Sequence, residues 1–178
     1  MSNQEKRPLI LISNDDGFSF NGIKTLIKVA RKYGDVVAVA PAMQQSGKGC
    51  SITFFDPLRA LKLKEEDGYT EYQVPGTPTD CVKMALNLFP DRKPDLIVGG
   101  INHGDNSSVN AHYSGTMGVA IEGALQGYPS IAFSLCDHRA DADFSPLLPY
   151  LADFALKTMK AKLPPFTCLN VNFPLAPE

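Results

Sequence analysis

Two short apolar runs joined by a helical pattern are the feature that most constrains the fold of this chain. The first run is Leu9–Ile12 and the second is Asp35–Ala40. Between them, apolar residues recur at the spacing of one helix face, at Ile23, Leu26, Ile27 and Ala30. Runs that are apolar without alternation are typical of strands buried on both faces, and a helix between two of them favours parallel pairing with a right-handed crossover. The sequence therefore begins with a predicted βαβ unit.

The same pattern recurs through the rest of the chain. Three further apolar runs lie at 94–100, 129–135 and 169–173, and helical patterns separate them. The segment 51–74 differs, because short alternating pieces there favour an antiparallel ribbon. Thr79 or Asp80 is placed to cap the helix that follows. We expect an α/β fold: a three-layer α/β/α sandwich with a Rossmann-like, mostly parallel sheet and an added antiparallel ribbon.

Composition limits the number of domains and the class of partner. The chain has 178 residues, 44% hydrophobic and 20% charged, so we expect one domain over 1–178. Its formal net charge of -2 argues against a broad basic surface for nucleic acid or anionic membranes. No apolar run is long enough to span a membrane, and the polar start Met1–Pro8 does not resemble a signal peptide, so we expect a cytoplasmic protein.

The polar segment Ser13–Gly17 directly follows the first apolar run and carries two adjacent carboxylates, Asp15 and Asp16. Parallel sheets bind ligands outside the carboxyl ends of their strands, which is where this segment falls. Like charges this close resist joint ionisation, so a divalent metal would stabilise them. The alternative is a plain turn, since all the residue types of Asn-Asp-Asp-Gly favour turns.

Three later segments are expected at the same edge. Ser46 lies in a glycine-containing loop after the second strand, and Asn102 follows the third. Ser114-Gly115-Thr116 opens a helix, where hydroxyls and free N–H groups suit a phosphate. Each also has a structural interpretation, because Asn102 can belong to a solvent turn and Ser114 can be a simple N-cap.

Carboxylate, hydroxyl and amide oxygens together suit one Mg²⁺ or Mn²⁺ ion, whereas a soft metal would require Cys or several His. The three histidines, His103, His112 and His138, lack the spacing of metal ligands, and we expect them to be structural or surface residues. A metal beside a phosphate site indicates metal-assisted hydrolysis of a phosphoester.

The chain resembles the SurE survival-protein nucleotidases. The resemblance covers five separated motifs in the order of that family: Ser13–Gly17, Val39–Pro41 with Ser46-Gly47, Gly76–Cys81, Gly100–Asn102 with Asn106, and Tyr113–Thr116. It implies a divalent-metal phosphatase that hydrolyses nucleoside 5′- and 3′-monophosphates, with short polyphosphate as a further substrate.

The resemblance also implies roles for single residues. The metal ligands would be Asp15, Asp16, Ser46 and Asn102. The phosphate contacts would be Asn106, Ser114, Gly115 and Thr116. Asp15 or Asp16 would act in catalysis by accepting a proton from the attacking water, and the residue pattern does not decide which.

The chain departs from the resemblance in two places. Residues 107–112 differ from the commoner form of that family's loop, which bears on substrate preference. The family's usual C-terminal hairpin and arm, which form dimer and tetramer contacts, are expected to be missing after Glu178.

Other functions also fit the residues. A metal- or nucleotide-binding module without turnover and a phosphatase of other small phosphoesters both remain alternatives. A phosphatase with an aspartyl nucleophile fits less well, because that chemistry uses D-x-D-G-[TV] whereas the two carboxylates here are adjacent.

Overall fold

The computed structural model describes residues 7–139 and 141–175, and within them seven strands form one sheet in the order β3-β4-β2-β1-β5-β6-β7. The strands are β1 (Leu9–Ser13), β2 (Asp35–Pro41), β3 (Leu61–Glu66), β4 (Tyr69–Val74), β5 (Leu96–His103), β6 (Ser130–Leu135) and β7 (Leu169–Phe173). All neighbouring strands pair in parallel except β3 and β4. The predicted mostly parallel sheet is confirmed.

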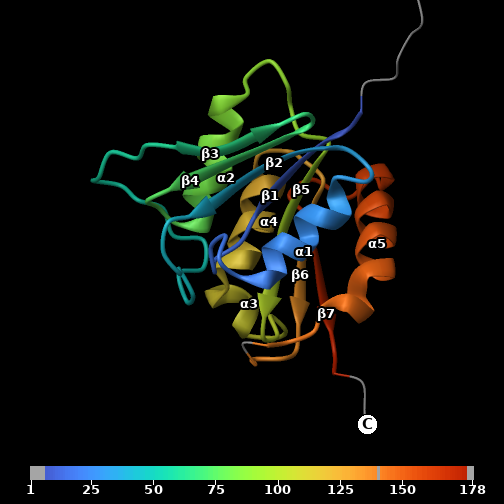
Figure 1. The fold of residues 1–178 in the computed structure, drawn as a ribbon. Coiled ribbons are helices and arrows are strands. Elements are labelled where there is room, and N and C mark those ends of the chain that lie inside the picture. The colour runs from blue at the N-terminus through green and yellow to red at the C-terminus, as the bar shows by residue number, and fades with distance from the viewer. Residues whose placement is uncertain (1–6, 140, 176–178) are drawn as a thin grey trace, which may run out of the picture.

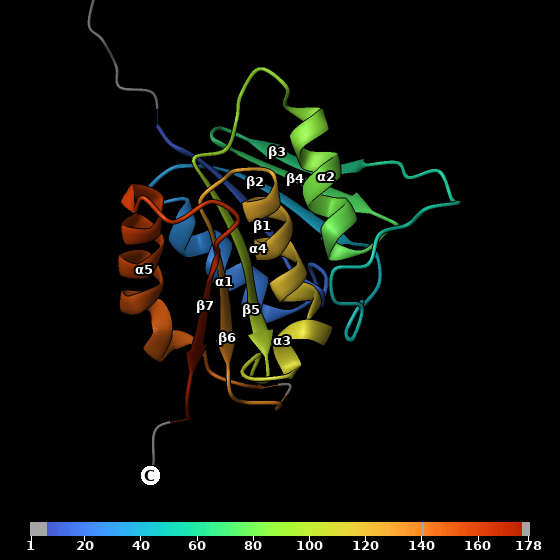
Figure 2. The ribbon, with the colours of Figure 1, turned by 180° about the vertical axis from the view of Figure 1, so that it is seen from behind.

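Helices cover both faces of the sheet, which gives the three predicted layers (Figures 1 and 2). The helices α1 (Asn21–Ala30) and α5 (Leu148–Lys160) lie on one face. The helices α2 (Pro78–Leu88) and α4 (Gly115–Leu125) lie on the other. Two short elements, α3 (Asn110–Tyr113) and the 3-10 turn η1 (Ser145–Leu147), complete the described secondary structure.

The alternation of side chains along β1 explains why this strand is apolar at every position. Ile10 and Ile12 pack into the core beneath α1 and α5, while Leu9 and Leu11 pack into the core beneath α2 and α4. Successive residues of a strand point to opposite faces, so a strand covered on both sides needs apolar residues throughout. The two cores therefore hold β1 at the centre of the sheet.

The ribbon differs from its prediction in one respect. The strand β4 pairs in parallel with β2 and belongs to the main sheet, so β3 alone runs antiparallel, at the edge. All six residues of β3 are exposed, which explains why their pattern resembled a ribbon rather than a buried strand.

The start of α2 also differs from its prediction. The N-cap is Thr77, two residues earlier than the first predicted cap, Thr79. The Thr77 hydroxyl accepts a hydrogen bond from the Asp80 N–H, and the Asp80 carboxylate accepts one from the Thr77 N–H, which is a capping box. Asp80 therefore contributes to the cap from within the helix.

The parallel pairing brings the carboxyl ends of β1, β2 and β5 to one edge of the sheet, where α3 also lies (Figure 1). The segments that carry the predicted site residues follow these strands. In the part of the chain that the structure describes, none of the helices has the length and apolar character needed to cross a membrane.

Candidate metal and phosphate site

The segment after β1 is a turn and also carries the two carboxylates. The Asn14 side chain closes the turn, because its Oδ1 accepts from the Gly17 N–H at 3.0 Å and its Nδ2 donates to the Gly17 carbonyl at 3.2 Å. This pairing occupies the side chain of Asn14 and leaves those of Asp15 and Asp16 to make other contacts. The two interpretations of this segment are therefore compatible.

Asp15 lies against the first turn of α4. Its side chain is buried, and its Oδ1 accepts a hydrogen bond from the Thr116 hydroxyl at 2.7 Å. A Cβ added at Gly115 would lie only 2.7 Å from the Asp15 Cβ, so a glycine is needed for the helix to approach this closely. Burial raises the pKa of Asp15, while the Thr116 hydroxyl and the nearby backbone N–H groups of Thr116 and Gly115 oppose that shift.

Asp16 has a buried oxygen that a cation would suit. It is 8% exposed, and its Oδ2 is buried with no hydrogen-bond partner among the described residues. Burial, and then the charge of Asp15, raise the pKa of Asp16 to about 6, against opposing effects of His103 and Gln44. A buried carboxylate oxygen without a partner is costly, and a cation beside it would remove that cost.

A cavity of about 250 Å³ joins five of the predicted site residues. These residues are Asp15, Ser46, Asn102, Asn106 and Ser114. They come from the loops after β1 and β2, from the end of β5 and the loop after it, and from the start of α4, so the topology brings together segments that are up to about a hundred residues apart. Asp16, Gly115 and Thr116 are buried and do not belong to the cavity lining.

The amide group of Asn102 has its oxygen free for a ligand. Its Nδ2 donates to the carbonyls of His103, at 3.2 Å, and Gly104, at 2.8 Å. This fixes the nitrogen and leaves Oδ1, a neutral oxygen donor, without a bond to the described residues. Ser46 adds an exposed hydroxyl from the loop after β2.

These donors fit a hard divalent cation. The described residues contain no cluster of three or more His, Cys, Asp or Glu side chains able to hold a metal, so a site here must combine the two carboxylates with neutral oxygens. Carboxylate, amide and hydroxyl oxygens are the ligands that Mg²⁺ and Mn²⁺ accept in proteins.

The two hydroxyl residues of the Ser-Gly-Thr segment make different contacts. Ser114 lines the cavity and is also the N-cap of α4, because its hydroxyl oxygen accepts from the Met117 N–H at 3.0 Å. Its hydroxyl hydrogen is not used in that bond. Thr116 is fully buried and its hydroxyl is directed to Asp15 instead of the cavity. Ser114 therefore both caps α4 and lines the cavity.

Several residues near the site were not predicted from the sequence. His103 and His138, expected to be structural or surface residues, line the cavity together with Tyr113 and Asp105. The Gln45 N–H donates to the Asp15 carbonyl at 2.7 Å, which fastens the Ser46 loop to the carboxylate segment. The position of His103 directly after Asn102 was the available signal, since both lie at the end of β5.

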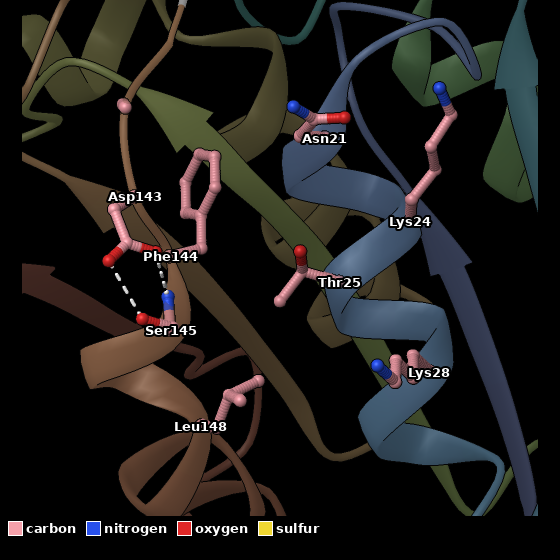
Figure 3. A pocket seen from close by; sticks show the side chains of 9 residues that line it. Asn21, Lys24, Thr25, Lys28, Asp143, Phe144, Ser145 and Leu148 are labelled. Atoms are coloured by element: carbon pink, nitrogen blue, oxygen red, sulfur yellow. Dashed lines mark hydrogen bonds between the residues drawn. The ribbon is translucent and has the colours of Figure 1, made fainter.

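A second, larger cavity of about 350 Å³ lies between α1 and the segment before α5 (Figure 3). Asp143 there already accepts from the N–H and the hydroxyl of Ser145, at 2.8 and 2.7 Å. Lys24 extends away from Phe144 in Figure 3, and its amino group donates to the Ser19 carbonyl. The polar groups of this cavity do not converge as those beside Asp15 do, so we place the site at the sheet edge.

Comparisons with known proteins identify the family to which the chain is similar. The family model described as "Survival protein SurE" matches residues 10–178. A protein of Bacteroides thetaiotaomicron named 5′-nucleotidase SurE is 56% identical over 175 residues, which is 98% of this chain and 68% of the relative. A protein of the same name from Flavobacterium johnsoniae is 49% identical over 98% of this chain and 68% of its own length.

A solved structure shows the same architecture. The crystal structure of SurE protein from Aquifex aeolicus matches with a TM-score of 0.82 and 38% sequence identity, over 94% of this chain and 66% of that one. The family match and these identities extend over nearly the whole chain and include every segment of the site. The chain belongs to the SurE family.

Proposed function

We propose that this chain is a divalent-metal-dependent phosphatase that hydrolyses nucleoside 5′-monophosphates, and also 3′-monophosphates, to nucleoside and phosphate. The relatives named 5′-nucleotidase SurE, which match 98% of the chain at up to 56% identity, support the reaction class. Short polyphosphate is a further substrate that the resemblance implies.

The observation that carries the proposal is the buried Oδ2 of Asp16, which has no partner among the described residues and lies beside a second buried carboxylate. Two carboxylates by themselves would repel a phosphate. The same pair with a bound cation would attract one, because the cation reverses the local charge.

The metal would be held by Asp15, Asp16, Ser46 and Asn102. When bound, a divalent ion polarises a phosphoryl oxygen and makes water more acidic. The protein keeps these ligands in place through the Thr116 hydroxyl on Asp15 and the two backbone carbonyls that fix the Asn102 amide.

The remaining residues bind and orient the phosphoryl group. Asn106 and Ser114 line the cavity and each has a donor for a phosphoryl oxygen. The positive end of α4 favours the negative charge that grows during the reaction. Gly115 and Thr116 act indirectly, through Asp15, because both contact that residue.

One of the two carboxylates would also accept a proton from the attacking water. Asp15 Oδ1 accepts a hydrogen bond from Thr116, and Asp16 Oδ2 would bind the metal, so the proton would go to one of the other two oxygens of the pair.

The test is phosphate release from a panel of nucleoside monophosphates with Mg²⁺, with Mn²⁺ and with EDTA. We expect release with either metal, none with EDTA, and a loss of at least about a hundredfold in Asp15→Asn. Asp153→Asn is the matched control, because Asp153 is exposed on α5 and pairs with Lys157. Release that persists in EDTA would contradict the proposal, and binding of metal and nucleotide without release would favour the non-catalytic module.

A further inference from the structure

Two asparagines of β7 hold the backbone of Asn106 on both sides. Asn172 Oδ1 accepts from the Asn106 N–H at 2.7 Å, and Asn170 Nδ2 donates to the Asn106 carbonyl at 2.8 Å. The two side chains also bond to each other, from Asn172 Nδ2 to Asn170 Oδ1 at 2.9 Å. Residues two apart on a strand share a face, so both asparagine side chains can reach the backbone of Asn106.

Ser134 of β6 fixes the side chain of the same residue. Its hydroxyl oxygen accepts from Asn106 Nδ2 at 2.8 Å, and both Ser134 and Asn106 are buried. Ser134 is the register partner of Asn172 across β6 and β7, which run side by side in Figure 2. Three side chains from two adjacent strands therefore hold one loop residue.

A count of donors gives the chemical consequence. An asparagine amide has two N–H hydrogens, and Ser134 takes one of them. In the structure it is Nδ2 that contacts Ser134, so the second N–H is left for a partner in the cavity that Asn106 lines. Without Ser134 the amide could rotate and present its oxygen, which would repel a phosphoryl oxygen.

We propose that Ser134, Asn170 and Asn172 are positioning residues that hold the Asn106 amide with its N–H toward the phosphoryl group. They contact neither the cavity nor the two carboxylates in the described contacts, and act through Asn106. The inference rests on the proposed function for the identity of the ligand, and it assigns the edge strand β7 a part in phosphate binding.

The experiment uses three single variants of the full chain, Ser134→Ala, Asn172→Ala and Asn106→Ala. It also uses the two double variants in which Ser134→Ala or Asn172→Ala is combined with Asn106→Ala. Two quantities are measured: kcat/KM for a nucleoside 5′-monophosphate, and the affinity for inorganic phosphate by calorimetry with Mg²⁺ present. Each single variant should lose roughly threefold to tenfold in both quantities, the worth of one hydrogen bond. In the Asn106→Ala background the same changes should cost less than about twofold, because the residue through which they act is gone.

Two controls separate positioning from stability. Asn87→Ala removes a side-chain bond on α2, far from the cavity, and should change neither quantity. Thermal unfolding of each variant reports its fold, and Asn170→Ala, at an exposed position, provides a second test of the β7 pair if Asn172→Ala unfolds.

The outcomes distinguish this inference from the proposed function. Phosphate binding that depends on Ser134 through Asn106, in a chain that releases no phosphate from nucleotides, would support the positioning network and reject the nucleotidase. Losses that simply add to that of Asn106→Ala would overturn the positioning role. The inference would also be wrong if inorganic phosphate does not bind the unaltered chain, or if it binds Asn106→Ala as tightly as the unaltered chain.

Discussion

At the scale of single residues, the two carboxylates are not equivalent. Asp15 is fixed by the Thr116 hydroxyl, whereas Asp16 has an oxygen without a partner in the described structure. The sequence identified the pair but not this difference, because Thr116 lies 101 residues from Asp15 and their contact depends on the whole sheet.

Asp16 should make the metal-free protein less stable at neutral pH than in mild acid. Its folded pKa of about 6 lies above the ordinary value of 3.8, so the folded chain binds the proton more tightly. Stability should therefore fall as the pH rises from about 4 to about 6, and stay lower above. Asp16→Asn should weaken this dependence, leaving the part that comes from Asp15, and gain about 1–2 kcal/mol at pH 7.5, allowing for partial solvent screening.

Urea unfolding in EDTA across that pH range measures the effect. Added Mg²⁺ should stabilise the unaltered chain and not Asp16→Asn, since ligand binding to the folded state raises stability. An unaltered chain whose stability is the same at pH 4.5 and pH 7.5 would show that Asp16 titrates normally.

Asp15 should tolerate a neutral isostere better than truncation. Burial raises its pKa, so the charge itself costs stability, and Asp15→Asn keeps an oxygen for the Thr116 hydroxyl. Asp15→Ala leaves that buried hydroxyl unpaired and should cost about 1–3 kcal/mol. Both variants should lose phosphate release, so comparing urea midpoints with activity separates the effect on stability from the effect on catalysis. Equal stability of Asp15→Asn and Asp15→Ala would contradict the role of the bond between Asp15 and the Thr116 hydroxyl.

At the scale of elements, the start of α4 depends on glycine. The sequence showed the helix and its Ser-Gly-Thr start, and glycines inside a helical pattern, here Gly118 and Gly123, favour close packing against a neighbour. Gly123 does so, against Ile97 of β5, whereas Gly118 faces the carbonyl of Gly49 in the loop after β2. Helical spacing identifies a close approach but not its partner, because the loop has no periodic pattern.

Gly115→Ala should reduce phosphate release by at least about tenfold, because the new Cβ would lie 2.7 Å from the Asp15 Cβ and push the carboxylate from its place. Gly123→Ala is the matched helix variant: its Cβ would meet the Ser130 hydroxyl at 2.3 Å, away from the cavity. It should lower the melting temperature with little change in kcat/KM of the folded enzyme. The opposite ranking of the two variants would contradict the role of Gly115.

Sequence patterns did not predict some of the other elements. The βα alternation predicted five of the seven strands as buried runs, but the alternating β4 resembled a ribbon strand and pairs in parallel with β2. The four-residue helix α3 was not predicted, since a single turn has no hydrophobic period to detect. The Asn106 contacts with Ser134 and β7, 28 to 66 residues away, needed the strand order.

At the scale of the whole molecule, the sheet order explains why this edge holds a site. The loops after β1 and β5 come from neighbouring strands, and the Ser46 loop follows β2 on the other side of β1. The carboxylate of Asp15 therefore shares a cavity with the Asn102 amide and the Ser46 hydroxyl, and the first turn of α4 packs against it. The same order places β6 and β7 where they can support Asn106.

The most direct test of the central claim is a crystal of the full chain soaked with Mn²⁺ and inorganic phosphate, with anomalous diffraction recorded to locate the metal. We predict one strong peak within coordinating distance of Asp16 Oδ2 and Asp15, and phosphate density next to Asn106 and Ser114. Asp16→Asn crystals treated in the same way should lose the peak. A peak elsewhere, or none at this edge in the unaltered chain, would contradict the assignment of the site.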